Sequence, residues 1–157
     1  MRSWLQLWRR QDGAAAVETA LVLIVAFPFI IGMVEFANAY WNWNSLLLAV
    51  AEGGRYAMAH ANSSTLAACT APTPAPTITG CTSGGGNYAS PNLPNCAAYE
   101  TSQSLIGLQA SSITITCSGS SPTTMTLVAT YEFDFVASAL LPYGPLTLTG
   151  RATVPLM

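Results

Sequence analysis

A long apolar run, Ala14 to Val34, limits what this chain can fold into more than any other feature of the sequence. As an α-helix rising about 1.5 Å per residue, it would extend about 32 Å, close to the roughly 30 Å hydrocarbon core of a bilayer. The run carries one charged residue, Glu18. The sequence therefore predicts one membrane-spanning helix over residues 14–35, with an unusual acid near its start.

The distribution of arginine predicts the orientation of this helix. Arg2, Arg9 and Arg10 all precede the apolar run. By the positive-inside rule, residues 1–13 stay in the cytoplasm and everything after Glu35 is exported. Glu35 itself is expected to be an acid at the membrane surface, where the helix leaves the lipid.

Four cysteines lie in the segment predicted to be exported: Cys69, Cys81, Cys96 and Cys117. An even number of cysteines in an oxidising compartment favours disulfides. No CxxC pair occurs, and the only histidine, His60, lies on a different segment, so a zinc site is not expected. Three pairings are possible, and the predicted layout favours Cys96 with Cys117, which leaves Cys69 with Cys81.

The helical pattern continues past the membrane segment, over residues 36–61. Apolar or small residues recur at steps of three or four: Phe36, Tyr40, Trp43, Leu47, Val50, Gly54 and Met58. This spacing predicts an amphipathic continuation of the same rod, with this stripe as its apolar face. Pro28 is expected to kink the rod, because proline removes one backbone donor and crowds the preceding turn.

Residues 62–157 read as an exported globular domain. Residues 62–95, rich in Thr, Ser, Pro and Gly, predict a long loop that the cysteines hold together. A short helix is expected over 96–108, followed by strands around 113–117, 124–135 and 146–154. The fold class is therefore α+β: a long N-terminal helix packed against a small antiparallel three-stranded sheet.

The start of the helix resembles the class III signal of type IV pilin-like proteins. Gly13 follows a short basic leader, and Glu18 is the fifth residue of a chain that begins at Ala14. The segment Glu52-Gly53-Gly54-Arg55-Tyr56-Ala57 is similar to the EGARYA-like segment of TadE-like pseudopilins of tight adherence pili. Thr19 departs from that family, in which an aromatic residue is more usual. The resemblance covers roughly residues 9–60 and implies a pilin-like fold.

The resemblance also implies processing and assembly. A prepilin peptidase would cut between Gly13 and Ala14 on the cytoplasmic face and leave the membrane helix on the mature protein. Glu18 would then neutralise the new amino terminus of a neighbouring subunit, a pairing that is stronger where water is scarce. Alternatively, Glu18 only reaches the inner membrane surface. Glu52 and Arg55 are spaced for an exposed ion pair, and the family match suggests that Arg55 holds the globular part against the rod.

Other classes of protein fit less well. The sequence Ala37-Asn38-Ala39 would allow signal peptidase I to release a soluble domain from Tyr40, but the apolar segment is longer than in ordinary signal peptides. No catalytic motif or cofactor-binding loop is recognisable, so an enzyme is not expected. The net charge of −2, with no basic patch beyond the leader, argues against nucleic-acid binding.

The expectation is thus a minor pilin or pseudopilin of a tight adherence (Flp, type IVb-like) pilus. It would be a single-pass protein of the bacterial inner membrane with a periplasmic or extracellular domain, and the resemblance allows its incorporation into a pilus. Its partners would be the prepilin peptidase, other pilins and the inner-membrane assembly platform, and its role would be pilus assembly, adhesion and biofilm formation. The runner-up is an anchored or secreted binding module that exposes the loop between Cys69 and Cys96.

Overall fold

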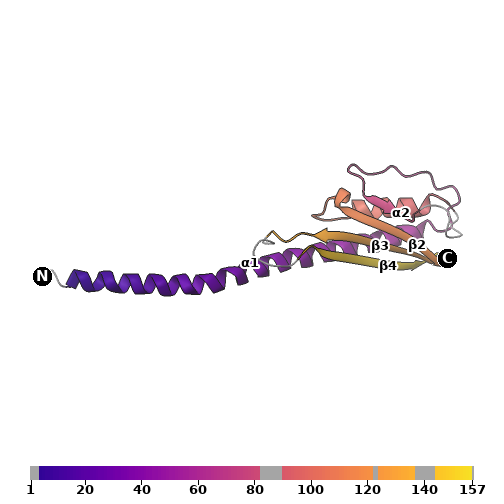
Figure 1. Cartoon of the computed structure of the whole chain (residues 1–157). Coiled ribbons are helices and arrows are strands. Elements are labelled where there is room, and N and C mark those ends of the chain that lie inside the picture. The colour runs from indigo at the N-terminus through magenta and orange to yellow at the C-terminus, as the bar shows by residue number, and fades with distance from the viewer. Residues whose placement is uncertain (1–3, 82–89, 122–123, 137–143, 157) are drawn as a thin grey trace.

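One long helix dominates the architecture (Figure 1). The computed structural model describes residues 4–81, 90–121, 124–136 and 144–156. Helix α1 (Trp4–Ala59, 56 residues) continues through Pro28 without a break. Its N-terminal half stands clear of the rest of the chain, and its C-terminal half lies along the domain (Figure 1). The single rod expected from residue 14 to about residue 61 is confirmed, and it begins before Gly13.

The sheet has four strands in the order β1-β2-β3-β4, so the expected number of three is wrong. Strands β2 (Ile113–Ser121), β3 (Thr124–Phe133) and β4 (Leu146–Pro155) form the expected antiparallel meander. The additional strand, β1 (Thr77–Thr79), pairs in parallel with β2 at the sheet edge. It lies within the segment expected to be a loop, of which Gly84 to Gly86 are not among the described residues.

A second helix, α2 (Leu93–Gln103), packs on α1. The expected bounds of 96–108 are therefore wrong at both ends. The helix begins earlier because Pro94 lies in its first turn, where a missing N–H costs nothing. It ends earlier, with Ser104 as its C-cap. The chain then turns at Gly107, whose φ is +80°, and forms the short 3-10 helix η1 (Ala110–Ser112) before β2.

The core lies between α1, α2 and one face of the sheet. The helix side consists mainly of small residues, and the sheet supplies the large ones: Ala39, Leu46, Val50, Ala57, Ala97 and Ala98 from the helices, and Ile113, Ile115, Met125, Leu127, Phe133 and Val154 from the strands.

The apolar stripe predicted for α1 is mostly wrong. Val50 and Gly54 are buried, whereas Phe36 is 72% and Tyr40 54% exposed. Small side chains let the sheet and α2 approach the helix closely, which aromatic side chains would prevent.

Two disulfides close the domain, and they contradict the favoured pairing. Cys69 is bonded to Cys96, and Cys81 to Cys117. The cause is β1, whose Thr79 is in register with Thr116 and so delivers Cys81 beside Cys117. Cys96, in the first turn of α2, is left for Cys69.

Candidate functional site

The N-terminal half of α1 from Gly13 onward exposes almost all of its side chains. Val17, Leu21 and Val22 are each more than 60% exposed, and Glu18 is exposed beside them. A Cβ atom added at Gly13 would meet nothing within 4 Å among the described residues. The helix described from Gly13 to Ala59 is long and apolar enough to cross a membrane. Because the described residues of the domain leave this surface exposed, its apolar side chains are available to lipid or to other helices.

The motif Glu52 to Ala57 lies where α1 meets both α2 and β4. A Cβ atom added at Gly53 would overlap the Thr101 hydroxyl and lie 2.7 Å from the Ala97 carbonyl oxygen, both on α2. A Cβ atom added at Gly54 would lie 2.9 Å from Val154 Cγ1 on β4. The two adjacent glycines therefore allow the close approach of two different elements to α1.

Arg55 does not hold the domain against the rod, which corrects the expectation from the family resemblance. Its Nη1 donates a hydrogen bond to Glu52 Oε2 at 2.8 Å, within the same helix. Both side chains of this predicted pair are largely exposed, at 73% and 47%. Such a pair stabilises a helix by only a few tenths of a kcal/mol. At this motif, the close contact between helix and domain is made at Gly53 and Gly54 instead. Two adjacent glycines inside a helical pattern are the sequence feature that indicates such close packing.

Glu35 occupies the point at which α1 enters the domain. Its side chain is 5% exposed, so it is buried in protein rather than lying at an open membrane surface as expected. Glu35 thus divides α1 into an exposed half and a half that packs on the domain.

Hydrogen bonds also fix α1 to the domain. The Ser45 hydroxyl donates to the Ile106 carbonyl oxygen and accepts from the Ile106 N–H, both at 2.8 Å. The Trp43 indole N–H donates to the Thr149 carbonyl oxygen of β4 at 3.2 Å. The orientation of the domain on α1 is therefore set by packing and by these specific bonds.

The base of the loop between Cys69 and Cys96 is held next to the end of α1. Beside the disulfide, the Asn92 side-chain amide donates to the Leu66 carbonyl oxygen at 2.9 Å. His60 stacks on Tyr56 with ring centroids 4.2 Å apart, and this contact packs the histidine against the end of α1. The centre of the loop falls in residues 82–89, which are not described.

These features define a class of protein: a pilin-like α+β fold, with a long N-terminal helix that is exposed in its first half and packed against a small sheet in its second. Residues 13–62 match the model of the TadE-like protein family, and this match supports a TadE-like, pilin-related protein. The match begins at Gly13, spans the motif at residues 52–57 and ends before the sheet, so the resemblance inferred from those residues is confirmed. Comparisons with curated proteins and with solved structures found no match.

The TadE-like family is a structural, pilus-related family that is not known as enzymatic. The match therefore suggests a component related to a Tad (tight adherence) pilus system. One apolar N-terminal helix is compatible with single-pass anchoring in a membrane.

Proposed function

We propose that this protein is a minor pilin or pseudopilin that a prepilin peptidase cleaves after Gly13. In this proposal the helix from Ala14 anchors the mature subunit in the bacterial inner membrane, with residues 62–157 outside the cytoplasm. The subunit then joins other pilins through its exposed helix at the assembly platform and supports pilus assembly, and through it adhesion and biofilm formation. The observation that carries the proposal is Glu18 at the fifth position after Gly13, on a helix half that the domain leaves uncovered.

The structure around Gly13 is favourable for cleavage. Gly13 lies inside α1, and a peptidase needs extended backbone at the bond that it cuts. Glycine in a helix interior costs roughly 1 kcal/mol relative to alanine, so the helix is weak there. A Cβ atom added at Gly13 would meet nothing within 4 Å among the described residues, so unwinding at this point breaks no close contact there.

Processing predicts a mature mass that begins at Ala14. In cells that contain the pilus system, mass spectrometry of the purified protein should find this mass, and Gly13→Leu should retain the leader. The matched control is Gly32→Leu, on an equally open part of the same helix, which should still be cleaved. A mature chain that begins at Met1 would contradict processing, and one that begins at Tyr40 would indicate an ordinary secretory signal.

Glu18 has an assembly role in this proposal, and its removal separates assembly from membrane insertion. An acid within a membrane helix costs up to about 2.5–3.5 kcal/mol at mid-helix, and less near an end, so it is retained where it gains a partner. We expect Glu18→Val to insert and to be cleaved normally, but to be lost from complexes with other pilins in co-purification. Unchanged recovery of those complexes would remove the role given to Glu18.

A second candidate function is an anchored binding module. The Cys69–Cys96 disulfide favours it, because a closed and anchored loop is a common form of recognition surface. This module would not need Glu18 for its activity. The Glu18→Val variant therefore distinguishes the two functions: lost co-assembly supports the pilin role, whereas normal co-assembly with normal surface binding supports the module.

A further inference from the structure

Exposed apolar side chains gather at one end of the domain. Figure 1 shows that β3 ends and β4 begins at the end nearest the exposed half of α1. Six residues of α1 and these strand ends form what we call the apolar rim: Phe36, Tyr40, Trp43, Phe135, Val136 and Leu146. Val136 is 91% exposed, Phe36 72% and Leu146 45%. An apolar groove of about 340 Å³ lies within the rim, between α1 and the start of β4.

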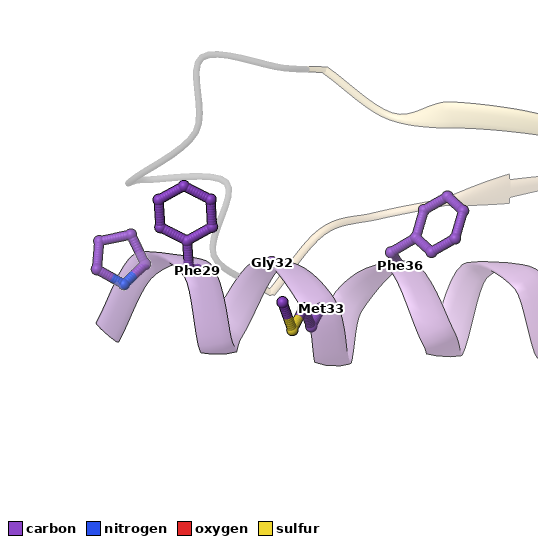
Figure 2. Close-up of a pocket in the computed structure, with 5 residues that line it drawn as sticks. Phe29, Gly32, Met33 and Phe36 are labelled. Carbon is purple, nitrogen blue, oxygen red and sulfur yellow. The ribbon is translucent and has the colours of Figure 1, made fainter. Parts of the chain in front are cut away.

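The rim is continuous with the surface of the predicted membrane span. A second groove, of about 400 Å³, lies along the span and is lined by Pro28, Phe29, Gly32, Met33 and Phe36. Figure 2 shows Phe29 and Phe36 on the same side of the helix with Gly32 between them. Phe36 lines both grooves. The surface of the span and the rim thus form one continuous apolar surface. A lipid or helix that covers the span would also contact the rim.

The end of the rim nearest the span falls in the interfacial layer of a bilayer. If residues 14–34 fill the hydrocarbon core, Phe36 lies about 3 Å and Tyr40 about 9 Å beyond its edge along the helix. The interfacial layer is roughly 5–8 Å thick on each side, so Phe36 lies within it when the helix is upright. Tilting of the helix lowers Tyr40 and Trp43, which is about 14 Å beyond the edge along the helix, toward this layer. Tyrosine and tryptophan are the residues enriched at this level of membrane proteins.

The charges around the rim indicate which part of the lipid it contacts. Beyond the span, the arginines of the described segments are Arg55, on the last turns of α1, and Arg151, paired with Val128 in mid-sheet. Neither belongs to the rim. Two acids, Glu132 and Asp134, are exposed at the end of β3 and just after it. The rim therefore suits the boundary between acyl chains and neutral headgroups rather than anionic lipid.

We propose that the apolar rim rests in the interfacial layer of the lipid bilayer, so that the domain lies on the membrane surface before the subunit is assembled. The inference depends on the membrane span of the proposed function. The lipid surface is the occupant that the continuity with the span supports. The domain cannot leave this surface without exposing the rim to water, unless a partner covers it.

Trp43 provides the test, because its indole N–H is bonded to Thr149 and its depth reports that of the domain. We use full-length Trp4→Phe/Trp8→Phe/Trp41→Phe protein, in which Trp43 is the single tryptophan, in phosphatidylcholine vesicles brominated at shallow or deep acyl positions. Fluorescence should be quenched more by shallow than by deep bromine, and adding phosphatidylglycerol should leave the quenching unchanged. In this background, Val136→Glu/Leu146→Glu should lose most of the quenching with an unchanged near-UV spectrum. Ile106→Glu, at an exposed apolar residue outside the rim, should retain it.

The span is monitored separately by adding Leu21→Trp and Trp43→Phe to the same background. Residue 21 is then the single tryptophan. Deep quenching at residue 21 without quenching of Trp43 would overturn the inference and leave the membrane span intact. The absence of quenching at both positions would overturn the span as well. Quenching of Trp43 that falls as more protein is added per lipid would show that a second copy covers the rim, and would also overturn the inference.

Discussion

Gly53→Ala should lower the free energy of unfolding of the domain by about 1–3 kcal/mol, although alanine is the better helix former. The new methyl group would overlap the Thr101 hydroxyl, which is itself fixed by a 2.8 Å hydrogen bond to the Ala97 carbonyl oxygen. Thr101 and Ala97 are fully buried, so neither can move without displacing α2. Thermal unfolding of the full-length protein in detergent, followed by near-UV circular dichroism, measures the loss.

Gly32→Ala is the matched control for this experiment. It makes the same substitution within the same helix, where the added Cβ atom meets nothing within 4 Å. It should leave the melting temperature unchanged or slightly raised. Arg55→Ala should also change little, because its partner Glu52 is on the same helix. A Gly53→Ala protein that melts at or above the wild-type temperature would contradict the role given to this contact.

Removing the Cys81–Cys117 disulfide should destabilise the domain by about 2–5 kcal/mol. Both cysteines are buried, at 2% and 3% exposed, and Cys117 is part of the core. The Cys81→Ala/Cys117→Ala variant therefore loses the crosslink and also leaves a small cavity. Cys69→Ala/Cys96→Ala should lose less, because Cys69 is only partly buried. Chemical denaturation of both variants ranks the two effects.

The pairing itself can be tested on the unmodified protein. Peptide mapping without reduction should recover the 69–96 and 81–117 crosslinks. Recovery of a 96–117 crosslink would contradict the structure and restore the pairing favoured by the sequence. Equal stability of the two double variants would remove the ranking while leaving the pairing in place.

Regular patterns made much of the fold predictable. The alternation that begins at Met125 and Leu127 predicted β3, and the long apolar run predicted α1. Strand β1 was missed because three residues, Thr77 to Thr79, carry no measurable period. Its parallel pairing with β2 depends on a contact more than thirty residues away. The disulfide pairing was lost with it, since β1 is what brings Cys81 to Cys117.

The packed face of α1 was mispredicted for a different reason. Sequence periodicity shows which side chains avoid water, but not whether protein or lipid covers them. In α1 the small residues Ala39, Gly53 and Gly54 are buried against the domain, whereas Phe36 and Tyr40 stay largely exposed. The proposed processing segment remains a prediction, and it depends on the spacing of Gly13 and Glu18 along the chain rather than on packing.

The continuity of α1 from the exposed half into the core has a mechanical consequence. No linker separates residues 13–34 from the part of the helix that carries Leu46 and Val50. A force applied along the helix axis at the exposed end of α1 therefore acts directly, as shear, on the contact between the helix and the sheet. The domain would follow such a pull as a rigid load, and the strength of that contact would limit the force that the subunit can transmit.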